Sequence, residues 1–203
     1  MARTPDLEMK RELLDRVVAY LAEHGLGDMS LRPMAAALGT SPNRLVHHFG
    51  SKQDLLTAAL QQATRIQEDV RDGWLKRQPD MTKTAELRKW WKWLNESPAN
   101  LALTRLGLEA VTLEATHTGL SGDVRAEQIG VWRELIEQSL IGTGVPPAVA
   151  NVEASLLKGM FTGLILDLIA TGDKVRLTKA LELALTRTEA VITASRASQS
   201  LIS

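Results

Sequence analysis

A short segment of the chain gathers side chains that can form hydrogen bonds with nucleic acid. Between residues 43 and 52 lie Asn43, Arg44, His47, His48 and Lys52. In the major groove of DNA, arginine can pair with guanine through two hydrogen bonds, and asparagine can pair with adenine in the same way. A lysine at a helix N-terminus suits a phosphate, because its charge adds to that of free backbone amides. These residue types favour binding to double-stranded DNA.

The local charge agrees with this interpretation, although the chain as a whole is neutral. The formal net charge is +0, whereas proteins that bind nucleic acid over a broad surface are usually basic. From Ser30 to Lys52, however, the charged residues are Arg32, Arg44 and Lys52, with no acid among them. We therefore expect a basic face confined to this segment.

Serines and glycines at regular intervals predict the helices that would position these side chains. Ser30 can cap a helix that ends at Gly39, and Ser41 can cap a second helix that ends at Gly50. Pro42 suits the first position of the second helix. Glycine permits the positive φ that a tight turn needs. Two short helices joined by such a turn form a helix-turn-helix.

The second of these helices would keep one side free. Leu45 and Phe49 are four residues apart and point back into the module, and Ser51 with Asp54 predicts a capping box for the next helix. The alternative is a helical hairpin of an ordinary bundle, because helix-turn-helix geometry is loosely encoded in sequence. The predicted DNA contacts are Ser30, Arg32, Thr40, Ser41, Asn43, Arg44, His47, His48 and Lys52.

The rest of the chain also has helical patterning, and strand signals are missing. We predict an all-α fold of about nine helices, near residues 7–23, 31–38, 42–49, 52–71, 84–95, 98–116, 121–141, 146–170 and 175–195. The short helices come first and the long ones follow. This order predicts a helix-turn-helix DNA-binding domain over residues 1–53, joined to a larger helical bundle over residues 54–203.

Several function classes lack their usual motifs. The chain has no cysteine, which excludes disulfides, thiolate metal sites and cysteine nucleophiles. It has no glycine-rich phosphate loop, no His-Glu-x-x-His and no Gly-x-Ser-x-Gly. The four histidines are not spaced as a metal site, since adjacent His47 and His48 do not face each other on a helix. We expect no enzyme activity, no cofactor and no bound metal.

The N-terminus and the apolar segments predict a cytoplasmic protein. Residues 1–6 lead into a charged stretch without the apolar core of a signal peptide. No uninterrupted apolar run reaches the roughly 18 residues that span a bilayer. We expect no association with membranes.

The quoted motifs resemble the signature of the TetR family of transcriptional regulators. The similarity covers roughly Leu7 to Leu60, and its most specific part is His-Phe-x-Ser-Lys-x-x-Leu at residues 48–55. The sequence departs from the family at Val46, where the family commonly has a tyrosine that touches phosphate or packs on the helix surface. That role cannot be carried over to Val46, and His47 beside it is the candidate for part of it.

The resemblance implies a homodimer in which the last two long helices of each subunit form a four-helix interface. Two stripes of apolar and small residues at helical spacing agree with this. The same stripes could instead lie in the subunit's own core. The predicted interface residues are Leu156, Gly159, Met160, Gly163, Leu164, Leu181, Leu185, Thr188 and Ile192.

The resemblance also implies a small-molecule site in the C-terminal bundle. Five tryptophans lie beyond the DNA-binding segment, in a chain with only one tyrosine and two phenylalanines. Flat aromatic walls suit apolar or cationic ligands, although each tryptophan could also simply fill the core. The predicted ligand-binding residues are Trp74, Trp91, Leu106, Glu109, Trp132 and Phe161.

Together these features predict a repressor that a small, largely apolar effector releases from an inverted-repeat operator. The sign of regulation comes from the resemblance only. The alternative is a constitutive DNA-binding regulator with no inducer, because the sequence does not distinguish an open bundle from a collapsed one.

Overall fold

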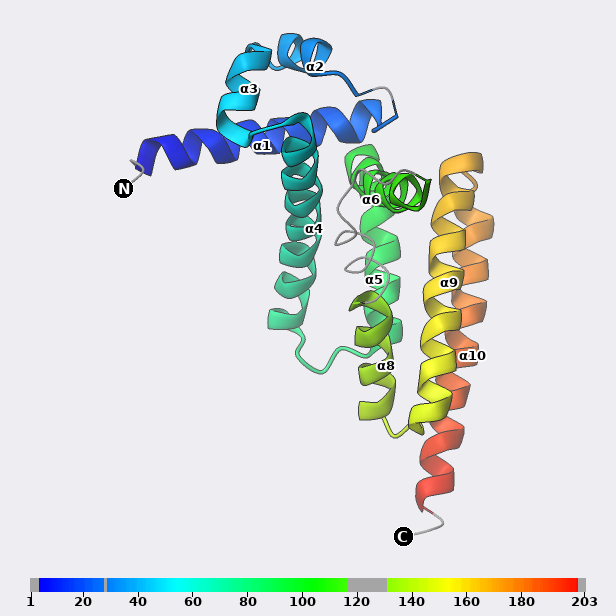
Figure 1. Cartoon of the computed structure of the whole chain (residues 1–203). Coiled ribbons are helices and arrows are strands. Elements are labelled where there is room, and N and C mark those ends of the chain that lie inside the picture. Colours follow the sequence, from blue (N-terminus) through cyan, green and yellow to red (C-terminus); the bar gives the residue numbers. More distant parts are fainter. Residues whose placement is uncertain (1–3, 28, 117–130, 201–203) are drawn as a thin grey trace. The chain divides into compact units, whose positions relative to one another are not determined.

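The computed structural model describes residues 4–27, 29–116 and 131–200, and within these ranges it contains helices and no strand (Figure 1). The all-α prediction is confirmed, and the described part contains the nine helices expected. Their bounds are α1 Thr4–His24, α2 Leu31–Ala37, α3 Pro42–Phe49, α4 Lys52–Arg77, α5 Lys83–Glu96, α6 Pro98–Thr116, α8 Trp132–Gly142, α9 Pro147–Thr171 and α10 Lys174–Ser200. The predicted helix start at Ser121 lies outside the described residues.

Local sequence signals account for several helix ends. Ser97 caps α6 through its hydroxyl, which accepts a hydrogen bond from the Asn100 amide at 3.2 Å. Pro147 occupies the first turn of α9, where its missing N–H costs nothing. Gly172 ends α9 in the left-handed conformation with φ 68°, which a residue with a Cβ adopts only at a cost.

One expectation from the sequence needs correction. Helix α9 is long and apolar enough, by length and composition alone, to cross a membrane. The expectation of no such segment rested on uninterrupted apolar runs, and the charges at Glu153, Lys158 and Asp167 do interrupt this one. Core helices of water-soluble proteins pass the same test, and one such helix is weak support for a membrane span.

The chain divides into two compact units. Unit 1 comprises Met1–Arg77 with Ser97–Gln128, and unit 2 comprises Gln78–Glu96 with Ile129–Ser203. Helices α1, α2, α3, α4 and α6 therefore lie in unit 1, and α5, α8, α9 and α10 in unit 2. The functional boundary predicted between residues 53 and 54 remains a prediction.

Unit 1 is built on an apolar core shared by α1, α2 and α3. Val17 and Leu21 of α1, Met34 of α2 and Leu45 of α3 are all 0% exposed. Helix α1 also holds the end of α2, because the Arg16 guanidinium donates to the Leu38 carbonyl. These contacts fix the short helices that are too small to be stable alone.

Helices α4 and α6 are fastened to this core by polar contacts. The Gln62 amide of α4 donates to the Asp15 carboxylate of α1 at 2.8 Å. The Gln67 amide donates to the Thr104 hydroxyl of α6 at 3.1 Å. Arg105 of α6 donates to the Ala22 carbonyl near the end of α1 at 2.7 Å. Thus α1, α4 and α6 form one connected body.

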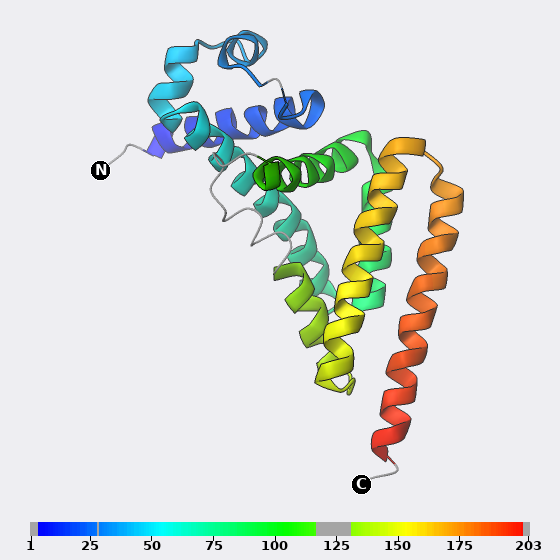
Figure 2. The ribbon, with the colours of Figure 1, turned by 45° about the vertical axis from the view of Figure 1, so that its right-hand side comes forward.

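In unit 2, α9 and α10 lie side by side and run in opposite directions (Figures 1 and 2). Leu177, Leu181 and Leu185 of α10 are at most 1% exposed, and Ala150 and Ala154 of α9 are 0% exposed. The small alanines let a neighbouring helix approach closely. The core of unit 2 therefore uses one face of each of these long helices.

Charged contacts join α5 to α10. Arg88 of α5 pairs with Glu182 at 2.8 Å and with Glu189 at 2.7 Å. Hydrogen bonding to Arg88 and Thr84 lowers the pKa of the Glu189 carboxyl. One guanidinium thus spans about two turns of α10.

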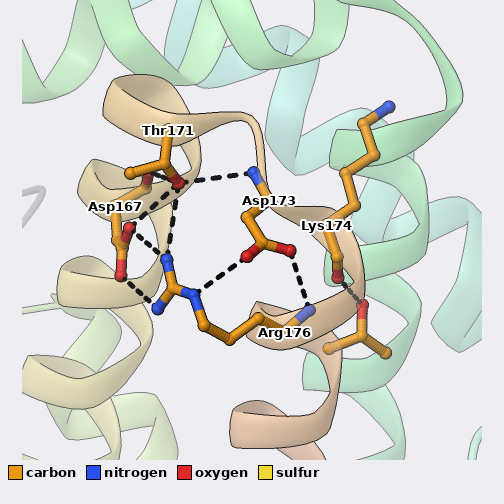
Figure 3. Close-up of polar contacts among 6 residues, drawn as sticks. Asp167, Thr171, Asp173, Lys174 and Arg176 are labelled. Carbon is orange, nitrogen blue, oxygen red and sulfur yellow. Dashed lines mark hydrogen bonds and ion pairs between the residues drawn. The ribbon is translucent and has the colours of Figure 1, made fainter.

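The turn between α9 and α10 is closed by a second arginine (Figure 3). Arg176 donates to both oxygens of Asp167, at 2.9 and 2.8 Å, and its Nε donates to Asp173 at 3.1 Å. These bonds lower the pKa values of both aspartates, the largest contribution at Asp173 being the Arg176 backbone amide. The contacts tie the last turn of α9 to the first turn of α10.

The opposite face of α9 is apolar and exposed. Val152 is 57% exposed, Leu156 61% and Leu166 52%. Exposed residues repeat along α9 at alternating steps of three and four, at Val149, Val152, Leu156, Gly159, Gly163, Leu166 and Ala170. This spacing is that of helices packed side by side in coiled coils and bundles. We name these seven residues the α9 stripe.

Candidate nucleic-acid interface

The turn between α2 and α3 follows the geometry that the sequence predicted at Gly39. Gly39 has φ 64°, and its amide donates to the Ala36 carbonyl at 3.1 Å. The Thr40 amide donates to the Ala35 carbonyl at 2.9 Å. This pair of hydrogen bonds is the Schellman motif that ends helices at glycine. Ala35 is 1% exposed, in agreement with its predicted role in close packing.

Ser30 differs from its predicted role as a cap. Its backbone has the extended conformation of an N-cap residue, with φ −125° and ψ 137°, but its side chain makes no capping hydrogen bond. The Ser30 side chain is exposed. Helix α2 starts because the preceding backbone is extended and the Met34 amide reaches the Ser30 carbonyl at 3.4 Å.

Helix α3 is capped as predicted. The Ser41 hydroxyl accepts a hydrogen bond from the Arg44 amide at 3.2 Å, and Pro42 stands in the first turn. Leu45 is 0% exposed and anchors the inner face. The cap fixes where the helix begins, and Leu45 fixes its rotation.

With Leu45 turned inward, α3 presents polar side chains on its outer face. Asn43, Arg44 and His47 are exposed, and His48 is half-buried. Val46 is 44% exposed on the same helix. Side chains one and four positions apart on a helix can reach the same groove of DNA. This face of α3 therefore has the side chains expected of a recognition helix. The DNA contacts themselves remain predictions.

The junction between α3 and α4 contains the predicted capping box. The Ser51 amide donates to Asp54 Oδ2 at 2.8 Å, and the Asp54 amide donates to Ser51 Oγ at 3.1 Å. The hydrogen bonds from Ser51 lower the pKa of the Asp54 carboxyl. Lys52, exposed at the first residue of α4, stands where a phosphate could meet its ammonium and the first-turn amides.

Gly50 is required at this junction for two reasons. Its φ is 90°, which residues with a Cβ rarely adopt. A Cβ placed there would also lie 2.6 Å from Asp54 Oδ2. The capping box and the glycine therefore depend on each other.

Helix α1 contributes contacts to the recognition helix that the sequence analysis did not assign. The Arg44 guanidinium donates to the Met9 sulfur at 2.9 Å. The Lys10 ammonium lies 5.3 Å from the centre of the Phe49 ring. In the sequence, Lys10 interrupts an otherwise apolar stripe of its helix. A cation in such a stripe indicates a contact with another side chain.

Two other predicted DNA contacts differ in exposure. Arg32 is exposed on α2, so its guanidinium is accessible. The Thr40 hydroxyl is buried and has no hydrogen-bond partner among the described residues. As placed, Thr40 does not present its hydroxyl to the surface, because the turn folds it inward. Its predicted contact would require a change of rotamer.

The predicted ligand-binding residues fall in both units, and those of unit 1 have structural roles. Trp74 is 8% exposed and Leu106 is 1% exposed. Glu109 accepts a hydrogen bond from the Leu26 amide at 2.9 Å and lies 3.5 Å from Arg105. The Glu109 carboxylate therefore holds the segment that follows α1, and its ligand role stays a prediction.

In unit 2 the aromatic residues form two edge-on groups. Trp91 meets Phe161 with ring centres 6.3 Å apart, and its indole N–H donates to the Thr178 hydroxyl at 2.8 Å. Trp90 meets Trp132 at 5.5 Å. Trp91 is only 4% exposed and lies in the core of unit 2, and its ligand contact stays a prediction. Trp132 and Phe161 are half-buried and keep part of their surface open.

The predicted interface residues separate by exposure. Leu156, Gly159 and Gly163 belong to the exposed α9 stripe, and Met160, Leu164 and Ile192 are half-buried. Leu181, Leu185 and Thr188 are between 0% and 3% exposed within the single chain. The assignment of these three to an interface surface is corrected, because they form the inner face of α10 in the core of unit 2.

Among the described residues, no group of three or more histidine, aspartate or glutamate side chains is placed to hold a metal ion.

The comparisons with known proteins place the N-terminal segment in a family. The family model described as bacterial regulatory proteins, tetR family, matches residues 13–59. No curated protein matches the chain significantly.

Solved structures share the fold over nearly the whole chain. A transcriptional regulator from Rhodococcus sp. Rha1 has 24% identity and a TM-score of 0.69, covering 88% of this chain and 94% of its own. A candidate transcriptional regulator from Pseudomonas aeruginosa PAO1 has 20% identity and a TM-score of 0.71, covering 96% and 95%. The multidrug binding protein EbrR, solved with imidazole, has 20% identity and a TM-score of 0.58, covering 87% and 89%. At these identities the likeness concerns the fold.

Proposed function

We propose that the chain is a homodimeric repressor which a small ligand releases from an inverted-repeat operator, because residues 13–59 match the model of the tetR family of bacterial regulatory proteins. The observation that carries the DNA-binding part is the outer face of α3. It exposes Asn43, Arg44 and His47 on a helix whose start and rotation are fixed by Ser41 and Leu45. Arginine and asparagine are the side chains that best distinguish guanine and adenine.

The α9 stripe supports the proposed dimer. A large apolar face exposed along seven helical positions is rare on a monomer and marks an interaction surface. Its two glycines, Gly159 and Gly163, have open space where a Cβ would stand, so a partner helix can come close there. A two-fold dimer places two copies of α3 in successive major grooves, about 34–36 Å apart.

Release by a ligand is supported by the way α6 is attached. Arg105 and Glu109 of α6 hold the Ala22 carbonyl at the end of α1 and the Leu26 amide just beyond it. A change in the position of α6 or α4 would therefore be passed to the helix-turn-helix. A ligand causes release only if it binds the two states with different affinity. EbrR, a multidrug binding protein with this fold, supports a small-molecule ligand.

The competing function is constitutive DNA binding without an effector. It is favoured by the burial of Trp74, Trp91 and Leu106, which fill space that a ligand would need. We do not propose an enzymatic activity, since regulators of this family act by binding DNA. We expect the protein to work in the cytoplasm, where its DNA is.

The experiment is a titration of labelled operator DNA, bound to the full chain, with a compound library. Fluorescence anisotropy reports release, and intrinsic tryptophan fluorescence reports binding of the compound. The proposal expects at least one compound to change both signals at the same concentration. DNA binding that no compound affects, together with unchanged tryptophan fluorescence, would support the constitutive alternative.

A further inference from the structure

Lys158 is a half-buried cation in the middle of the apolar helix α9. Among the described residues its ammonium has one hydrogen-bond partner, the Thr162 hydroxyl at 3.3 Å. A neutral hydroxyl on the same helix does not compensate a buried charge. Burial accordingly lowers the pKa of the Lys158 ammonium. Among the described residues, no carboxylate is paired with this ammonium.

The carboxylates of α8 and α10, the two helices with the most contacts to α9, lie near arginines. On α8, Glu137 pairs with Arg133 at 2.6 Å and accepts from Asn151, while exposed Glu134 lies 4.0 Å from Arg133. On α10, Glu182 and Glu189 pair with Arg88 of α5.

The acids of α9 itself do not serve Lys158 either. Asp167 pairs with Arg176 at 2.8 Å. Glu153 precedes Lys158 by five residues, which is about 140° around the helix, so its side chain leaves a different face.

Helix geometry places Lys158 beside the first turn of α8. Asn151 and Lys158 are seven residues apart and share a face of α9. Asn151 touches Glu137 at 3.2 Å, so this face looks toward α8. Helices α8 and α9 run in opposite directions (Figure 1). Trp132, five residues before Glu137, therefore lies within about 3 Å of Lys158 in height along the helix axis.

This level of unit 2 is rich in partly open aromatic surface. Trp90 meets Trp132 at 5.5 Å and Trp93 at 5.1 Å between ring centres. Trp132 and Trp93 are half-buried, and so is Phe161, one turn above Lys158 on α9. A cation that pairs with no carboxylate of the described residues, at the level of flat aromatic side chains, suits a ligand that has a flat apolar body and a negative charge.

We propose that Lys158 and the aromatic group around Trp132 bind an organic anion, a carboxylate with an aromatic or similarly flat apolar body. The Lys158 ammonium holds the carboxylate, the Thr162 hydroxyl accepts from Lys158 and donates to the carboxylate, and the Trp132 ring covers the apolar body. This deepens the proposed function, on which it rests, by giving the effector a negative charge rather than a neutral or positive one.

The test uses three probes of equal shape and different charge: 1-naphthoate, 1-naphthamide and 1-naphthylmethylammonium. Isothermal titration calorimetry with the full chain measures each affinity up to 1 mM probe (about the weakest binding of use here). We expect naphthoate to bind about tenfold or more tightly than naphthamide, as one charge-assisted contact in a partly dry site predicts. The ammonium probe should bind most weakly.

Three variants assign the preference to a residue. Lys158→Met should reduce naphthoate affinity to that of naphthamide, and Lys158→Arg should keep the order of the probes. Lys92→Met, the same change at an exposed lysine of α5, should leave all three affinities unchanged. Circular dichroism and melting temperature check that each variant is folded.

Equal affinities of the wild-type chain for the three probes, or no naphthoate binding at 1 mM, would overturn the proposal without any variant. An unchanged naphthoate preference in Lys158→Met would overturn it as well. Operator release is measured separately. If naphthoate binds through Lys158 but does not release DNA, the anion site stands and the effector function fails.

Discussion

At the scale of single residues, the proposed DNA recognition depends on side chains that a helix cap or a glycine holds in position. Arg44 is on the exposed face of α3 because Ser41 fixes the first turn and Leu45 fixes the rotation. In the structure its guanidinium rests on the Met9 sulfur of α1. A thioether is a weak hydrogen-bond acceptor. The Arg44 guanidinium therefore loses little free energy when it leaves Met9 to bind a guanine.

Replacement of Arg44 should therefore change both affinity and specificity. Arg44→Ala is expected to cost roughly 1–3 kcal/mol on operator DNA and to relax the preference at one base pair. Competition binding with operators changed at single positions measures both effects.

Lys52→Ala is the contrasting variant, because a phosphate contact carries no base information. It should weaken all sequences about equally and lower the slope of log K against log salt by about one. If Arg44→Ala left the base preferences intact, Arg44 would have no role in base recognition.

Gly50→Ala should destabilise the chain, because it forces a Cβ into a positive φ and against Asp54. The expected cost is about 1–3 kcal/mol in the free energy of unfolding, measured by urea denaturation. Gly27→Ala is the control, since a Cβ at Gly27 would meet nothing within 4 Å. Equal stability of the two variants would show that Gly50 is not required.

At the scale of elements, the sequence predicted helix ends better than helix faces. Ser41, Ser51 with Asp54, and Gly39 each act through neighbours within five residues, so local spacing suffices to find them. Ser30 occupies a cap position without bonding, which depends on a side-chain rotamer that no pattern shows. The apolar stripe of α10 was visible, but only three-dimensional packing shows that Leu181 and Leu185 turn inward.

The turn between α9 and α10 gives a prediction about pH. Arg176 lowers the pKa values of Asp167 and Asp173 (Figure 3). An aspartate with a lowered folded pKa stabilises the fold above its unfolded value, near 3.8. That stability is lost as the pH falls through the folded pKa.

In Arg176→Met, the pKa of Asp167 should return toward 3.8, and the turn should no longer lose stability below about pH 4. A carboxyl NMR titration of both chains measures the shift. Lys179→Met, an exposed change on the same helix, should leave the Asp167 titration as it is. An unaltered Asp167 pKa in Arg176→Met would contradict the hydrogen bonds between Arg176 and Asp167.

The α9 stripe gives a prediction about assembly. Leu156 is 61% exposed, so Leu156→Glu should leave the single chain folded while placing a charge in the proposed interface. We expect the dimer to dissociate at micromolar concentration, as measured by sedimentation velocity. Leu7→Glu changes an equally exposed leucine of α1 and should remain dimeric. A wild-type chain that sediments as a monomer would contradict the dimer itself.

At the scale of the whole molecule, the neutral net charge hides a segment without acids. Composition alone does not predict DNA binding. The prediction depends on the motif over residues 30–56. The aromatic packing of unit 2 was the least predictable feature. Helical periodicity indicates that Trp91 is buried, but it does not show that the Trp91 indole N–H donates to the Thr178 hydroxyl. The sequence did not indicate a binding role for Lys158, because a single lysine in an apolar helix usually lies on a solvated face.

Sequence-specific DNA binding is tested most directly by selection of duplex DNA from a random pool by the full chain at 0.15 M salt. We expect enrichment of an inverted repeat whose half-site centres lie about one helical turn or a multiple of it apart. Arg44→Ala should lose this enrichment. A pool that stays random after repeated rounds with the wild-type chain would contradict sequence-specific DNA binding.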